Sequence, residues 1–520
     1  MNKYQSHSRR LIHNSVFSLS ATVGTSIIAF FLVPFLVRHL GNDAYGVWVL
    51  IGSVFAYAMT LQLGLSSAIN RQIPVFLVKH DKAGVNRVIS TSVFFFGCVG
   101  LLLILIALVV ADNLQHWFSI PPGLADDART LVLVVGGLFA LSMPIQPFGA
   151  VISGLQRYDV HGLGQLIPTM LRAALVVWAL SAGYGLLAVG LIFGLCEITI
   201  YLVYLLFARR ILSPISVSVA FLDFTLLREM LAYGLNTFLY VTTGIIVFKA
   251  SDIILAVFMT TGDVTRFAIA AAPLLMVTQL VRASVGALKP AVSDLDARDD
   301  HGRVREISFL GQKYSLLLLI PAISFLIAMG REFLTLWVGD GFADLGTIVA
   351  VLAVGQFFMA AQYSNFLVLV GKGEHKAFGV MAVAMALSAV ALGIGFVGAL
   401  KWGLMGMAIA NAAPMLLIYG VIMPVYYHRR MSISTVEFAR HILAPALAGC
   451  APAVAVIGLW KLFAPPGSWS QLGMVIVSVA LVWAPSVWKL SLSRVERERF
   501  LGIVLAWGGR ENNNAGIGEG

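Results

Sequence analysis

The sequence VISTSVFFFGCVGLLLILIALVVA, residues 88–111, contains 24 residues and no charged side chain. A span of about 20 apolar residues matches a hydrocarbon core roughly 30 Å thick. Because lipid offers the backbone no hydrogen-bond partner, such a span is predicted to be a transmembrane α-helix. The preceding loop, residues 69–87, carries four Lys/Arg, whereas the following segment, residues 112–128, carries none.

The same contrast between successive loops runs along the whole chain. The apolar pattern predicts helices at 16–37, 45–68, 88–111, 129–152, 164–183, 186–208, 231–256, 266–290, 307–329, 346–370, 377–398, 402–427, 441–463 and 471–489. If the N-terminus, the even-numbered loops and the tail lie on one side, that side holds 26 of the 35 Lys/Arg, the other side holds 6, and 3 lie within the helices. This positive-inside asymmetry predicts a multi-pass inner-membrane protein with both termini in the cytoplasm.

The composition excludes several classes of protein. The chain is 59% hydrophobic and 12% charged, about half the charged fraction of a soluble protein. We interpret the net charge of +10 as loops near anionic headgroups, not as a nucleic-acid surface. No glycine-rich phosphate loop, no metal-ligand spacing and no nucleophile motif is present, so we expect neither an enzyme nor a cofactor or metal.

An internal repeat organises the predicted helices. The hairpin YGLLA (184–188) recurs as WGLMG (402–406), and Gly154 recurs as Gly371, at nearly the same offset in the numbering (402 − 184 = 218 and 371 − 154 = 217). An even number of helices gives both halves one orientation, which predicts two six-helix bundles related by a pseudo-two-fold axis along the membrane normal, plus two C-terminal helices. The alternative is that glycine hairpins recur by chance. The predicted parts are an N-terminal bundle (1–210), a cytoplasmic linker (211–230), a C-terminal bundle (231–430), helices 13 and 14 (431–490) and a cytoplasmic, partly disordered tail (491–520).

Five ionisable residues lie inside the predicted helices. They are Arg172, Glu197, Lys249, Asp252 and Arg282. Each costs about 3 kcal/mol or more at the bilayer centre, so each should face protein or water. One interpretation is structural pairing, of Arg172 with Glu197 and of Lys249 with Asp252 at i, i+3. The other is a solvated, net-cationic cavity that binds an anion.

Arg282 carries the cavity hypothesis, because it has no acidic neighbour in the sequence. It is expected near the middle of the eighth helix, on a stripe with Gln279 and Gly286 that faces the cavity. Glu197 and Asp252 are the acids available to carry a coupling ion, and Glu197 is preferred because Lys249 should hold Asp252 ionised. The pattern of residues 491–510 is typical of an interfacial amphipathic helix. The alternative, which we favour, is that this segment is a simple topological anchor.

Four stretches carry a family resemblance. LGNDAYGVW (40–48), LGLSSAINR (63–71), GLQRY (154–158) and residues 233–252 resemble the corresponding regions of Wzx-type oligosaccharide flippases. These proteins belong to the multidrug/oligosaccharidyl-lipid/polysaccharide exporter superfamily. The resemblance implies two six-helix bundles that form a V, alternating access, and a lipid-diphosphate-linked oligosaccharide as cargo.

The resulting hypothesis is a flippase for undecaprenyl-diphosphate-linked repeat units in surface polysaccharide (O-antigen or exopolysaccharide) biosynthesis. Arg282, Arg172 and Lys249 would bind the cargo's diphosphate or acidic sugars, and Glu197 and Asp252 would couple an ion. The expected partners are the lipid-linked oligosaccharide, membrane lipids, a polysaccharide polymerase and glycosyltransferases. Two alternatives stay open: a multidrug or cation antiporter of the same superfamily, and a non-transporting scaffold for glycosyltransferases.

Overall fold

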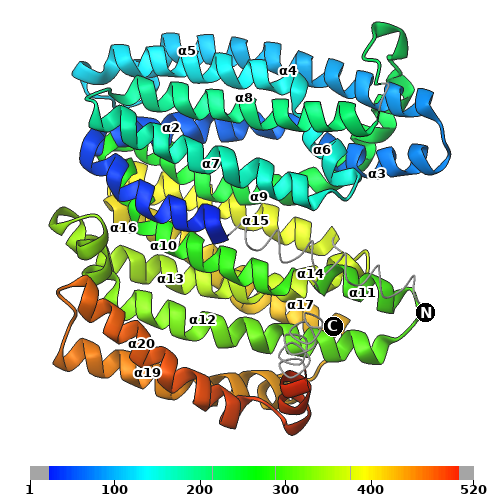
Figure 1. Ribbon diagram of the computed structural model, residues 1–520. Coiled ribbons are helices and arrows are strands. Elements are labelled where there is room, and N and C mark those ends of the chain that lie inside the picture. Colours follow the sequence, from blue (N-terminus) through cyan, green and yellow to red (C-terminus); the bar gives the residue numbers. More distant parts are fainter. Residues whose placement is uncertain (1–22, 213–214, 287, 375, 503–520) are drawn as a thin grey trace, which may run out of the picture. The chain divides into compact units, whose positions relative to one another are not determined.

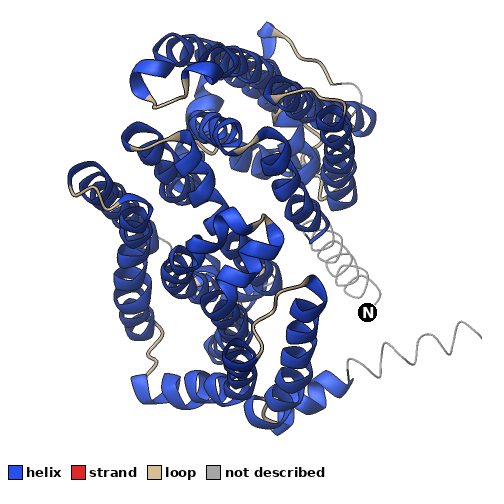
Figure 2. Cartoon of the chain, turned by 90° about the vertical axis from the view of Figure 1, so that its left-hand side faces the viewer, coloured by secondary structure: helices blue, strands red, loops and turns tan. Residues whose placement is uncertain are grey.

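The computed structural model describes residues 23–502, except 213–214, 287 and 375. These residues form helices joined by short loops, with no strand among them (Figure 2). Thirteen helical stretches in the described part are long and apolar enough to cross a membrane, and α9 (Phe224–Phe258) covers the predicted seventh span. The prediction of an all-α membrane protein with about 14 spans is therefore confirmed. The expected disordered tail end, residues 512–520, lies outside the described residues.

The chain divides into two compact units. The first unit comprises Met1–Ala283 and Lys376–Ile418. Its helices are Val23–Leu40, α2 (Asn42–Met59), α3 (Leu65–Val78), α4 (Lys82–Trp117), α5 (Ala125–Ser142), α6 (Pro147–Gly154), α7 (Tyr158–Ser181), α8 (Leu186–Ile211), α9, α10 (Thr261–Val285, whose last two residues fall in the second unit), α15 (Lys376–Gly393) and α16 (Gly403–Leu417) (Figure 1). Within it, α9 packs against α2, α3 and α15.

The second unit comprises Ser284–His375 and Tyr419–Gly520. Its helices are α11 (Leu288–Asp296), α12 (His301–Trp337), α13 (Gly346–Ala361), α14 (Tyr363–Gly371), α17 (Met423–Arg430), α18 (Thr435–Phe438), α19 (Ala444–Phe463), α20 (Trp469–Ser486) and a tail helix at 494–502. The helices α9, α10, α15 and α16 group with the N-terminal helices, so this division differs from the predicted bundles 1–210 and 231–430. The two predicted bundles stay a prediction.

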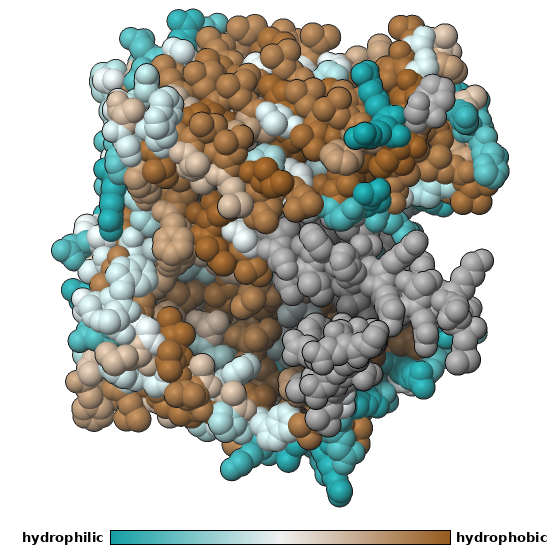
Figure 3. Space-filling model, viewed as in Figure 1, coloured by the Kyte–Doolittle hydropathy of each residue, from teal (hydrophilic) through white to brown (hydrophobic). Residues whose placement is uncertain are grey.

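The helix α4 has apolar side chains on both its buried and its exposed faces. Leu101 and Leu105, one turn apart, are 66% and 59% exposed, while Phe96 and Leu103 on other sides of the helix are fully buried. Figure 3 shows apolar side chains covering the face over α4, α5 and α8. Such an exposed leucine surface would favour association in water but is the expected contact surface for lipid.

The predicted helices 45–68 and 129–152 are each broken. Residues 45–68 were expected to be one helix, but it stops at a 3₁₀ turn, Thr60–Gln62, followed by Leu63 and Gly64 in the left-handed region (φ 49° and 71°). A side chain on Gly64 would overlap with the carbonyl oxygen of Gly234 in α9, so only glycine permits this close helix crossing. Residues 129–152 break likewise at Met143–Ile145, where Pro144 removes a backbone donor.

The helix boundaries repeat along the chain. The starts of α4 and α12 differ by 219 in the numbering (301 − 82), those of α7 and α15 by 218 (376 − 158), and those of α8 and α16 by 217 (403 − 186). The breaks repeat as well, since the α5–α6 break ends at Gln146 and the α13–α14 break lies at Gln362 (362 − 146 = 216). These offsets agree with those expected from the glycine hairpins, so chance recurrence of such hairpins does not explain the pattern.

Candidate functional site

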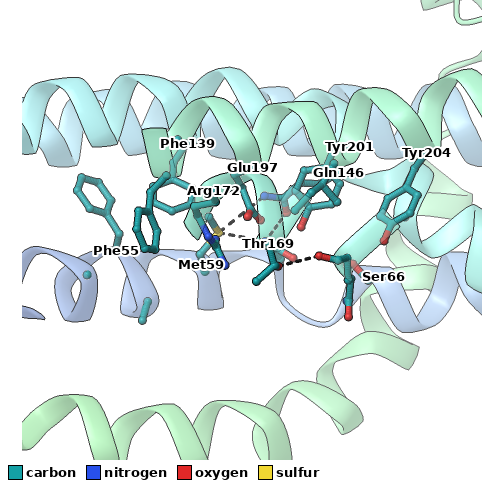
Figure 4. Close-up of a pocket in the computed structure, with 18 of the residues that line it drawn as sticks. Phe55, Met59, Ser66, Phe139, Gln146, Thr169, Arg172, Glu197, Tyr201 and Tyr204 are labelled. Atoms are coloured by element: carbon teal, nitrogen blue, oxygen red, sulfur yellow. Dashed lines mark hydrogen bonds between the residues drawn. The ribbon is translucent and has the colours of Figure 1, made fainter. Parts of the chain in front are cut away.

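A pocket of about 770 Å³ lies inside the first unit (Figure 4). Its walls come from the helix Val23–Leu40 and from α2, α3, α5, α6, α7 and α8, so the helices of the N-terminal half build it. This volume falls in the range of roughly 300–1,000 Å³ that is typical of small-molecule sites. Two of the predicted site residues, Arg172 and Glu197, line it and point into it from α7 and α8.

Two neighbouring rows of side chains line this pocket. The row on α7, called the α7 stripe, consists of His161, Gln165, Thr169 and Arg172. The row on α8, called the α8 stripe, consists of Phe193, Glu197, Tyr201 and Tyr204. Residues three or four apart share one face of a helix, so each stripe presents one side chain per turn. The helices α7 and α8 lie side by side, and the stripes therefore form a polar and aromatic track (Figure 1).

Ring contacts hold the track in place at both ends. At one end, the Arg172 guanidinium lies over the Phe193 ring, 4.5 Å from its centroid, and Trp48 of α2 meets the same ring edge-on at 4.7 Å. At the other end, His161 stacks on Tyr204 with centroids 5.5 Å apart, and the Tyr204 hydroxyl donates to the His161 carbonyl oxygen at 2.9 Å. A desolvated cation–π contact contributes about 2 kcal/mol and fixes the guanidinium plane.

The two helix breaks meet at the pocket. Gln62, in the α2–α3 break, donates from Nε2 to Oε1 of Gln146, in the α5–α6 break, at 2.7 Å. Both amides line the pocket, and Met59 contacts both through its sulfur. Discontinuous membrane helices free backbone polar groups at mid-membrane and are a recurrent feature of transporter binding sites.

Lys249 and Asp252 form a separate ion pair, in which Asp252 is buried and Lys249 is partly exposed. Lys249 Nζ lies 3.4 Å from Asp252 Oδ2, which confirms the predicted i, i+3 pair. Asp252 is 5% exposed and also accepts a 2.7 Å hydrogen bond from Ser53 of α2. One residue earlier in α9, Ser251 accepts a hydrogen bond from Asn411 of α16 at 2.9 Å. These contacts join α9 to α2 and α16, and neither Lys249 nor Asp252 lines the pocket described above.

Arg282 occupies a different position from the expected one. It lies in the last turn of α10, three residues before that helix ends at Val285. Gly286 follows the end of α10, whereas Gln279 and Arg282 lie within it; that this stripe faces a cavity stays a prediction. The start of α10 lies 219 positions after the start of α2 (261 − 42). When the two starts are aligned, Arg282 corresponds to Leu63, which lies in the break between α2 and α3. Arg282 does not line the pocket.

Comparison with known proteins identifies the family. The family model described as "Polysaccharide biosynthesis protein" matches residues 11–296, more than half of the chain. The chain belongs to the polysaccharide biosynthesis protein family. It is 22% identical over 490 residues to the "Uncharacterized membrane protein EpsK" of Bacillus subtilis (strain 168), covering 93% of this chain and 96% of that protein. It is 24% identical over 407 residues to the "Putative O-antigen transporter" of Shigella flexneri, covering 77% and 94%.

Solved structures of two membrane proteins show a similar fold. The lipid II flippase MurJ, in an inward closed conformation, matches with a TM-score of 0.70 at 14% identity, over 91% of this chain and 98% of its own. An inward-facing multidrug transporter of the MATE family matches with a TM-score of 0.63 at 13% identity, over 80% and 98%. At these identities the likeness shows the fold alone. With the family match, it confirms the resemblance predicted from the sequence.

In this member of the polysaccharide biosynthesis family, sequence reasoning missed much of the pocket wall. Gln62, Gln146 and the aromatic residues Trp48 and Tyr201 carry no charge, so the search for ionisable side chains passed over them. The spacing of polar residues could have identified His161 as a site residue. Gln165, Thr169 and Arg172 follow it by four, eight and eleven residues, so all four share one face of a helix. Polar residues at that helical spacing within an apolar span indicate a face turned away from lipid.

Proposed function

We propose that this protein is a flippase that moves undecaprenyl-diphosphate-linked oligosaccharide across the inner membrane by alternating access. The observation that carries the proposal is a partly open pocket of about 770 Å³, formed by helices of the family-matched part of the chain, in which polar side chains lie among apolar ones. The relative whose name includes O-antigen transport and the fold likeness to a lipid II flippase support it. The asymmetry of Lys/Arg between loops supports cytoplasmic termini.

The site residues take different roles in this proposal. Arg172 contacts cargo inside the pocket, and Arg282 contacts it at the end of α10. Lys249 is already engaged by Asp252, and therefore contributes to cargo binding only if that pair opens during transport. Glu197 is the proposed carrier of the coupling ion because it is the acid in the pocket, and Asp252 is the second acid. A polymerase and glycosyltransferases are the proposed protein partners.

Complementation of a flippase-null strain tests the proposal. Expression of the protein should restore surface polysaccharide, and Arg172→Ala should abolish the restoration while the protein still accumulates in the membrane. Arg172→Lys should keep part of the activity, because the charge remains but the planar fork is lost. Unchanged polysaccharide together with altered drug resistance would contradict the proposal and favour a multidrug antiporter. Unchanged polysaccharide with glycosyltransferases retained on the membrane would favour a scaffold.

A further inference from the structure

We infer that the pocket of the first unit holds sugar rings of the cargo and not its diphosphate. This inference rests on the proposed function and specifies which part of the cargo the α7 and α8 stripes contact. It concerns the side chains that line one partly open pocket. Three properties of that pocket support the inference: its charge, the chemistry of its lining and its length.

The charge of the pocket is balanced. Arg172 and Glu197 are the formally charged side chains among its lining residues, and their charges cancel when His161 is counted as neutral. A diphosphate diester brings about two negative charges, and an uncompensated buried ion costs several kcal/mol. A neutral sugar avoids this cost, because its hydroxyl groups accept from Arg172 and donate to Glu197.

The lining combines aromatic rings with amides and hydroxyls. Trp48, Phe139, Phe193 and Tyr201 are all only partly buried and line the pocket. The C–H faces of sugar rings pack against aromatic faces, and their hydroxyls need donors and acceptors at short intervals. Such a surface gives large contact area at little cost in side-chain entropy, since aromatic side chains have two rotatable bonds.

The length of the track suits a chain of sugars. From His161 to Arg172 the α7 stripe spans eleven residues, about 16 Å at a rise of roughly 1.5 Å per residue. It offers a polar side chain on every turn over about half of a hydrocarbon core roughly 30 Å thick. A single anionic group requires one point of contact, whereas this track offers several at successive heights.

The second repeat lacks the same chemistry. When the start of α15 is aligned with that of α7, His161 corresponds to Gly379 and Arg172 to Val390. When the start of α16 is aligned with that of α8, Glu197 corresponds to Pro414. Because the fold repeats without these side chains, the fold does not require them, and a ligand of the first unit accounts for their presence.

Site-specific photo-crosslinking tests the inference in cells. A benzophenone amino acid replaces Phe139 in the pocket, and the matched control replaces Leu141, which is 68% exposed on the same helix. One strain makes the complete lipid-linked repeat unit, and a second lacks the glycosyltransferases and makes the bare polyprenyl diphosphate. We expect sugar-bearing adducts, identified by mass spectrometry, at position 139 in the first strain alone. Bare carrier adducts at position 139, or no adduct in cells whose export depends on the protein, would overturn the inference.

Binding of undecaprenyl diphosphate without sugar to the purified protein in nanodiscs gives a second test. Glu197→Gln leaves the pocket with one positive charge. A diphosphate site would then bind this probe at least about tenfold more tightly, whereas we expect less than a threefold change. Tightening of tenfold or more would overturn the inference. If the gene deletion leaves polysaccharide export intact, the proposed function fails instead, so the two failures are distinguishable.

Discussion

The ion pair between Lys313 of α12 and Glu496 of the tail is predicted to hold helix 494–502 in place. Lys313 Nζ donates to Glu496 Oε2 at 2.8 Å, and the side chains are only 8% and 10% exposed. Glu496 also accepts from the backbone N–H of Ser493 at 2.7 Å. Replacing Lys313 by methionine keeps the side-chain length but leaves a buried carboxylate without its cation. Breaking a buried pair in this way costs about 3–5 kcal/mol.

Amide hydrogen exchange of residues 494–502 in the purified protein measures this cost as a local opening. A loss of about 3 kcal/mol corresponds to exchange faster by at least a hundredfold, since about 1.4 kcal/mol is tenfold. The matched control is Glu498→Gln, because the Arg494–Glu498 pair is 92% and 63% exposed and should contribute less than about 1 kcal/mol. If Lys313→Met accelerates exchange no more than the control, the reasoning about burial is refuted.

Three further predictions concern the tail, a helix crossing and the pocket. Burial raises the pKa of Glu496, but hydrogen bonds from Lys313 and Ser493 outweigh this effect, so the pKa is lowered. The protection of the 494–502 amides from hydrogen exchange should therefore hold above about pH 4.3, the ordinary pKa of a glutamate, and be lost as the pH falls through the lowered pKa. Amide hydrogen exchange measured as a function of pH checks this prediction. Gly64→Ala should cost more than about 1 kcal/mol and lower the thermal unfolding temperature in detergent, whereas Gly97→Ala, with open space around it, should not. Gln146→Leu should lower export in the complementation assay without lowering protein level, because Gln62 loses its partner; normal export would contradict that role.

The architecture could largely be read from the sequence because lipid imposes a simple rule on composition. The apolar spans, the alternation of basic loops and the repeat offset are properties of single segments, and the structure reproduces the spans and the offset. The helix breaks could not be placed in the same way. Whether the chain breaks at Gly64 depends on the close approach of Gly234, which lies far along the chain in α9, and no local pattern records that approach.

The candidate site was predictable only where charge marked it. Arg172 and Glu197 stood out because ionised side chains are costly in lipid, and the structure brings both to one pocket. The same rule selected Lys249 and Asp252, which pair with each other outside that pocket. It also selected Arg282, which lies in the last turn of α10 and not near its middle, because the apolar pattern does not mark the residue at which α10 ends.

The central claim is that the protein moves lipid-linked sugar between leaflets. Its most direct test is reconstitution into liposomes that carry undecaprenyl-diphosphate-linked oligosaccharide, with the outward-facing fraction measured over time by labelling the sugar with an impermeant reagent. The account predicts that the label reaches nearly all of the cargo with the protein present, and about half of it with Arg172→Ala or with empty liposomes. Equal labelling in all three preparations, with folded protein in each proteoliposome, would contradict the account.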